Sequence, residues 1–113
     1  MYNLDGKQFA GVINTASGEV DQRTQFTYHQ NANIVWAEYS GGEVLKGQLV
    51  AKIRENGLLD MHYQHINTSG KIMTGKCTSE VEKLADGRLK LKKRWQWLCP
   101  PYSAGYSEVI EVQ

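Results

Sequence analysis

The chain has 113 residues and a mass of 12.8 kDa, which predicts one domain over residues 1–113. Lys and Arg total 13 against 12 Asp and Glu, and this net charge of +1 excludes proteins that hold nucleic acid or an anionic membrane mainly by charge. No apolar run approaches the roughly 20 residues that a membrane helix needs. Residues 1–6 lack the basic and apolar regions of a signal peptide, so we expect a cytoplasmic protein.

Turn signals separate eight segments that are rich in β-branched and aromatic residues. Short strands between turns such as Gly41-Gly42, Ser69-Gly70 and Asp86-Gly87 are typical of an antiparallel meander. No segment carries a convincing helical period of 3.6 residues. The predicted strands are 7–14, 22–30, 34–40, 44–53, 58–67, 72–82, 88–98 and 106–112.

The register of two hairpins follows from their turns. A turn through Gly41-Gly42 places Trp36 opposite Gly47, and a turn through Gly70 places Tyr63 opposite Gly75. A large aromatic side chain facing a glycine packs well in a curved sheet. Continuing the alternation predicts one charged face and one apolar and aromatic face. On the second face, the charged side chains and the aromatic ones with a polar atom are Tyr28, Trp36, Glu38, Tyr63, His65, Lys93, Trp95, Trp97, Tyr106 and Glu108.

With no helix to cover it, a single sheet buries its apolar face by rolling onto itself. The predicted fold is therefore all-β, an eight-stranded antiparallel up-and-down barrel, because closure also removes both sheet edges. The alternative is a two-sheet β-sandwich of the same meander. A barrel of eight strands has an interior that side chains fill or that holds one small ligand.

Charged side chains lie among the aromatic ones on the predicted inner face. They indicate either a polar cavity or a network in which the buried charged groups pair with one another. The predicted ligand-binding residues are Trp36, Glu38, Tyr63, His65, Lys93, Trp95, Trp97, Tyr106 and Glu108. Loop 99–105, the longest, is the expected lid over this pocket. Three other interpretations stay open: exposure of Glu38 and His65 at the rim, a structural ion pair of Lys93 with Glu108, and tryptophans that only fill the barrel.

Catalytic signals are weaker. Glu38 and His65 are candidates for an acid–base pair at the barrel mouth, but the sequence has no nucleophile elbow, P-loop or Rossmann glycine pattern. Cys77 and Cys99 are expected to be free thiols rather than a disulfide. No zinc-type spacing of Cys or His occurs, so we expect no metal and no cofactor.

The outer face suggests a third function, an interaction module. The stripe of Lys90, Lys92 and Arg94 offers a basic surface, although Glu80 and Glu82 lie across the hairpin and offset it. Apolar residues on the same side predict a patch through which a homodimer would form. The predicted patch residues are Val35, Ala37, Tyr39, Val50, Ile66 and Ile72.

Four segments resemble a family of small bacterial all-β proteins of about 110 residues that often carry the label N-acetylglutamate synthase. They are residues 39–42 (YSGG), 60–67 (DMHYQHIN), 73–77 (MTGKC) and 95–97 (WQW). The chain has no pyrophosphate-binding turn opening a helix, so the sequence does not predict acetyl-CoA chemistry. The meander also resembles avidin-type and lipocalin-type (calycin) barrels. That resemblance implies small-molecule binding at an open end lined by Trp and Tyr.

Overall fold

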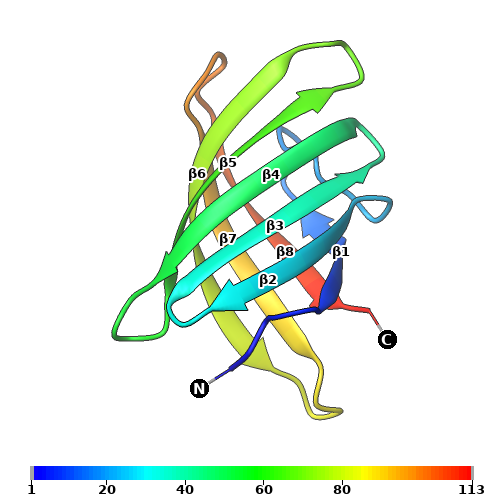
Figure 1. The fold of residues 1–113 in the computed structure, drawn as a ribbon. Helices are drawn as coiled ribbons and strands as arrows, with labels where there is room; N and C mark the ends of the chain where they lie inside the picture. Colours follow the sequence, from blue (N-terminus) through cyan, green and yellow to red (C-terminus); the bar gives the residue numbers. More distant parts are fainter. Residues whose placement is uncertain (1, 113) are drawn as a thin grey trace.

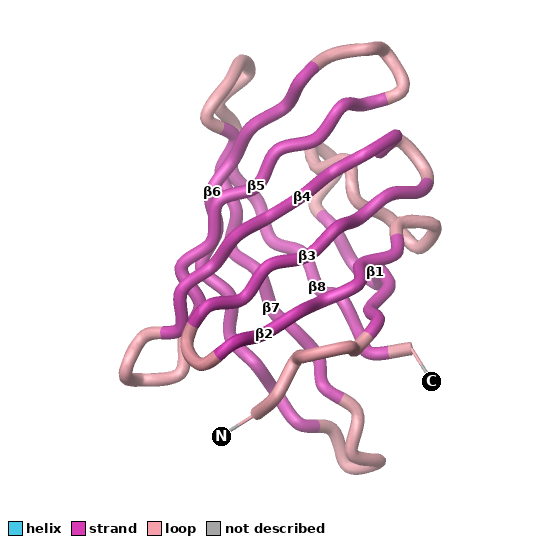
Figure 2. The backbone as a smooth tube through the Cα atoms, in the orientation of Figure 1, coloured by secondary structure: helices cyan, strands magenta, loops and turns pink. Residues whose placement is uncertain are grey.

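The computed structural model describes residues 2–112, and these form a closed antiparallel barrel in which each strand pairs with its sequence neighbours and β1 pairs with β8. Figures 1 and 2 show the strands curving into a barrel, with the connections at its two ends. The predicted barrel is thus confirmed, and the sandwich is not formed. The strands are β1 (Gln8–Asn14), β2 (Gln25–Asn31), β3 (Ile34–Gly41), β4 (Val44–Ile53), β5 (Leu59–Asn67), β6 (Ile72–Lys83), β7 (Leu89–Trp97) and β8 (Ala104–Glu111).

The two ends of the barrel differ. Loops 15–24, 42–43, 68–71 and 98–103 gather at one end, which we call the mouth, as expected for connections that follow odd-numbered strands. The other three connections lie at the opposite end, the base, together with the two chain termini (Figure 1). No helix that could cross a membrane occurs in the described part of the chain.

Three aromatic side chains inside the barrel each lie over a glycine of the next strand. Tyr63 faces Gly75, as predicted. Gly47 faces Tyr39 rather than Trp36, and Trp95 faces Gly105. A Cβ atom added to any of these glycines would lie about 2.4–2.5 Å from ring atoms of its partner. The glycines therefore let the rings lie flat against the barrel wall.

Strand β3 has the opposite orientation to the one predicted. Gly41 pairs with Val44, and the register shifts between Tyr39 and Gly41. Because side chains alternate with a period of two, a slip of one residue exchanges the two faces of a strand. Val35, Ala37 and Tyr39 are consequently buried, so the predicted homodimer patch loses these three members.

Strand β8 is also reversed relative to the prediction. Ser107 and Val109 are buried inside the barrel, because Ser107 pairs with Lys93 and Val109 with Leu91. The connection 98–103 contains a Pro-Pro pair and a residue with positive φ, Tyr102. A loop of this length does not determine the register with which the next strand pairs. The alternation along β7 therefore does not predict which side chains of β8 point into the barrel.

Candidate ligand site

A cavity of about 40 Å³ lies inside the barrel toward the mouth. Since a cavity needs at least about 10–15 Å³ to hold one water molecule, this cavity is large enough for water. Its walls are mainly aromatic and apolar, with a few polar groups from loop 15–24 and from β1, β5, β7 and β8. The lining residues are Asn14, Gly18, Glu19, Val20, Phe26, Tyr39, Leu49, Met61, Tyr63, His65, Cys77, Lys93, Trp95, Trp97, Ser107 and Val109.

Trp95 and Trp97 form one wall because both project inward from β7. Their ring centroids are 5.6 Å apart. Trp95 Nε1 donates to Asn14 Oδ1 at 3.0 Å, and Trp97 Nε1 donates to the Ser17 carbonyl oxygen at 3.2 Å. Buried indoles usually find such acceptors. The two bonds join the tryptophan wall to the segment that leads from β1 into loop 15–24.

Loop 15–24, which we call the covering loop, places a carboxylate in the mouth. Glu19 Oε1 lies 2.7 Å from His65 Nε2, and Glu19 Oε2 accepts from Asn67 Nδ2 at 3.0 Å. The Glu19 side chain is 19 % exposed and that of His65 only 1 %. The covering loop is therefore the lid of this barrel, in place of the predicted loop 99–105.

The His65 ring connects the mouth to the interior. Since a carboxylate can only accept, His65 Nε2 carries the proton toward Glu19. On the other side of the ring, Nδ1 lies 2.9 Å from the Tyr39 hydroxyl. Burial raises the pKa of that hydroxyl well above its usual value, so Tyr39 forms this hydrogen bond as an uncharged hydroxyl.

Lys93 is a buried lysine inside the barrel, and it is 6 % exposed. Its Nζ lies 2.9 Å from the Tyr28 hydroxyl oxygen and 4.4 Å from the centroid of the Phe26 ring. Desolvation lowers the pKa of the Lys93 ammonium to about 8. It also raises the pKa of the Tyr28 hydroxyl well above its usual value, which keeps that hydroxyl protonated.

Five of the nine predicted ligand-binding residues line this cavity: Tyr63, His65, Lys93, Trp95 and Trp97. The alternation along β5 and β7 placed them correctly. Tyr63 is half-buried, and its ring packs edge-on against Trp97 with centroids 5.8 Å apart. Contact of these five residues with a ligand remains a prediction.

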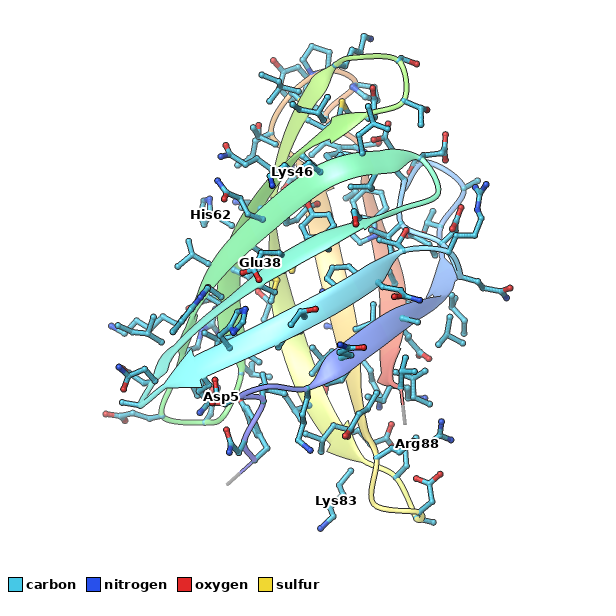
Figure 3. All side chains as sticks on the ribbon, turned by 45° about the vertical axis from the view of Figure 1, so that its right-hand side comes forward. Asp5, Glu38, Lys46, His62, Lys83 and Arg88 are labelled. Atoms are coloured by element: carbon cyan, nitrogen blue, oxygen red, sulfur yellow. The ribbon has the colours of Figure 1, made fainter. Side chains whose placement is uncertain are left out.

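The inward placement of Trp36 and Glu38 is wrong, because β3 is reversed. Trp36 is 39 % exposed and stacks on His29. Glu38 has a side chain that is 62 % exposed, and its Oε1 lies 2.8 Å from His29 Nε2 on the outer face (Figure 3). The acid–base pair of Glu38 with His65 is therefore not formed, and the carboxylate beside His65 is Glu19.

The inward placement of Tyr106 and Glu108 is wrong as well, because β8 is reversed. The Tyr106 hydroxyl donates to Glu108 Oε2 at 2.6 Å. This bond raises the pKa of Tyr106 to about 12 and lowers the pKa of Glu108. Glu108 also lies 3.3 Å from Lys90 on the outer face, so the ion pair considered with Lys93 is not formed.

The outer basic stripe is offset by acidic neighbours. Glu82 lies 3.7 Å from Lys90 and 3.5 Å from Lys92, in agreement with the expected compensation across the β6–β7 hairpin. Over residues 2–112, no three His, Cys, Asp or Glu side chains converge as a metal site requires. Both cysteines are free thiols, as expected.

Sequence reasoning missed Glu19, Asn14, Asn67 and Tyr39. Correct parity on β3 would have found Tyr39, since the Tyr39–Gly47 pair follows the same aromatic–glycine rule as Tyr63–Gly75. Glu19 had no such signal. It lies in an irregular loop, where alternation says nothing about which way a side chain points.

A family model described as avidin-like protein matches residues 2–112. Comparison with curated proteins and with solved structures found no significant match. The match covers nearly the whole chain and agrees with a closed meander barrel whose cavity is lined by Trp and Tyr. This chain belongs to the avidin-like protein family.

Proposed function

We propose that this protein binds a small polar metabolite inside its barrel, between the tryptophan wall and the covering loop. The observation that carries the proposal is the mouth network. There, Glu19 supplies a carboxylate to two donors, His65 Nε2 and Asn67 Nδ2, at the entrance of an aromatic cavity. Concave aromatic sites with a few converging polar groups are the usual form of small-molecule sites.

The size of the cavity indicates how the ligand enters. Sites for drug-sized ligands have about 300–1,000 Å³, whereas this cavity has about 40 Å³. A larger ligand therefore requires the covering loop to withdraw Glu19 from the mouth. A ligand bearing a carboxylate or another strong acceptor can then take the place of Glu19 at His65 and Asn67, so that no buried donor is left unpaired.

Native mass spectrometry of the freshly purified protein is the first test. The expected result is a small adduct that is present in the native spectrum and absent after denaturation. Its mass identifies the ligand directly. An adduct that survives in a Trp97→Ala/His65→Ala variant would place the ligand outside the cavity and contradict the proposal.

Tryptophan fluorescence provides a second test, because the chain has two interior tryptophans and one outer one. A Trp36→Leu background removes the outer fluorophore and leaves Trp95 and Trp97 as reporters. Titration with acetate, propionate and benzoate is expected to give a saturable change that Asn67→Leu weakens at least tenfold. A response that is linear in concentration, or equal in the Asn67→Leu variant, would contradict binding at the mouth.

We also propose that two copies pair through the outer face of β3 and β4. Trp36 lies opposite Val50 there, and both are exposed beside Ile34. Exposed apolar groups on a regular sheet can pack against the same groups of a second copy. Light scattering after size-exclusion chromatography is expected to give twice the chain mass for the natural protein and the single chain mass for Trp36→Lys. A monomer at high micromolar concentration would exclude the dimer.

The free cysteines support a location in a reducing compartment. Cys77 is buried beside Met61, and Cys99 lies near Met73. We place the protein in the cytoplasm, where thiols persist.

A further inference from the structure

Lys93 is held in the interior without an acidic partner. It pairs with Ser79 of β6 on one side and with Ser107 of β8 on the other, so its side chain points into the barrel between two small residues. Within the described chain, Lys93 takes part in no ion pair. A buried ammonium without a carboxylate is costly, and the fold keeps one that lines the cavity.

Burial increases the uncharged fraction of this amine. The titratable groups with which it interacts are the Tyr28 hydroxyl on β2 and the Cys77 thiol on β6, and burial raises the pKa of both. With the Lys93 pKa lowered to about 8, about one amine in ten is neutral at pH 7, against fewer than about one in a thousand for an ordinary lysine. A neutral amine in an apolar pocket is a nucleophile for carbonyl carbon.

We propose that the cavity is a site for a short aldehyde, which Lys93 captures as an imine. The inference rests on the proposed interior binding and names a ligand class for it. A cavity of about 40 Å³, far below the roughly 300–1,000 Å³ of sites for drug-sized ligands, restricts the aldehyde to a very short alkyl chain. The aromatic wall and the apolar lining then hold the alkyl part of the adduct.

The reaction balances without an oxidant or a reductant. The lone pair of Lys93 Nζ attacks the carbonyl carbon, and a proton passes from nitrogen to oxygen to give a carbinolamine. The carbon–oxygen bond then breaks, the hydroxyl leaves as water, and the carbon–nitrogen double bond forms. Amine and aldehyde thus yield imine and water. The Tyr28 hydroxyl, 2.9 Å from Nζ, is placed to pass the proton to the leaving oxygen.

The test traps the imine. The natural protein is incubated at pH 7 with propanal and cyanoborohydride, which reduces imines, and intact and peptide masses are then measured. The expected result is one propyl group on Lys93, added at least tenfold faster than at any exposed lysine. Lys93→Met is expected to lose this addition, and Lys46→Met, which removes an outward-pointing lysine (Figure 3), is expected to keep it.

Propan-1-ol tests interior binding separately from imine formation, because an alcohol of the same size can occupy the cavity but cannot form an imine. Its binding is followed by Trp95 and Trp97 fluorescence in the Trp36→Leu background. Saturable alcohol binding without propyl addition at Lys93 would overturn the imine and leave the proposed function standing. Propyl groups spread over exposed lysines with no alcohol binding would overturn both. The peptide masses of the natural protein decide the matter even if Lys93→Met does not fold.

Discussion

At the scale of single residues, Lys93 makes the stability of the barrel depend on pH. Its pKa is about 8 in the folded protein and about 10.4 in an unfolded chain. Between these values the unfolded chain binds more protons than the folded one, so the free energy of unfolding rises with pH. Below about pH 8 both states hold the proton, so the folded state is destabilised by the whole free energy of burying the charge.

Urea unfolding at pH 7.5 and pH 9.5 measures this effect. Relative to Lys93→Met, the natural protein is expected to gain about 2 kcal/mol between the two pH values. The comparison with Lys93→Met removes the contributions of groups that titrate in both proteins, including the buried tyrosines. The same pH dependence in both proteins would show that Lys93 is not held as a desolvated ammonium.

The two thiols are expected to differ in reactivity. Cys77 is buried, and burial raises its pKa, so its thiolate is scarce and inaccessible. Cys99 is only partly buried. With an aromatic disulfide reagent at pH 8, Cys99 is expected to react at least tenfold faster than Cys77, which reacts only when the barrel opens. Cys99→Ser should leave only the slow phase, and a fast phase in that variant would contradict the burial of Cys77.

At the scale of elements, the carboxylate of Glu19 joins the covering loop to β5. Glu19→Ala leaves the donors of His65 and Asn67 without their acceptor, which costs about 1–3 kcal/mol when the groups stay buried. In the Trp36→Leu background, this change is expected to lower stability by that amount and to make Trp97 at least twofold more accessible to acrylamide. Glu43→Ala, an exposed glutamate at the same end, is the matched control. Equal quenching in the two variants would show that Glu19 does not hold the loop.

The elements also show which parts of the fold can be predicted from the sequence. The connection between β5 and β6 is short, and its glycine-containing turn determines the register, so Tyr63 faces Gly75 as predicted. The neighbouring pairs, His65–Met73 and Met61–Cys77, follow the same register. The β3–β4 hairpin has an equally clear turn, but register shifts on both strands exchanged the faces of β3. Bulges of this kind leave little trace in composition.

The candidate site divides in the same way. The inward residues on β5 and β7 were predicted because successive side chains of a strand without a bulge point to opposite faces of the sheet. Glu38 was misplaced because β3 ends in a register shift, and Glu108 was misplaced because β8 follows a long loop. Glu19 was missed because its role arises from a loop that reaches over the mouth, and only the three-dimensional contacts with His65 and Asn67 reveal it.

At the scale of the whole molecule, the barrel wall is weakest between β1 and β2. Only three residue pairs join these strands, Gln8–Thr27 to Ala10–Gln25, whereas nine pairs join β6 and β7. Native-state hydrogen exchange is therefore expected to be faster in β1 and β2 than in β6 and β7. Uniform protection around the barrel would show that it opens only by global unfolding and that the mouth has no local route for ligand entry.

The position of the termini has a practical consequence. Val112 N donates to Gln8 O at 2.8 Å, and both chain ends leave the barrel at the base, away from the mouth (Figure 1). A peptide tag or a sensor-chip tether attached at either end would thus leave the entrance unobstructed. Immobilised in this way, the protein would present its mouth to flowing solution, which suits surface-based screening of metabolite libraries.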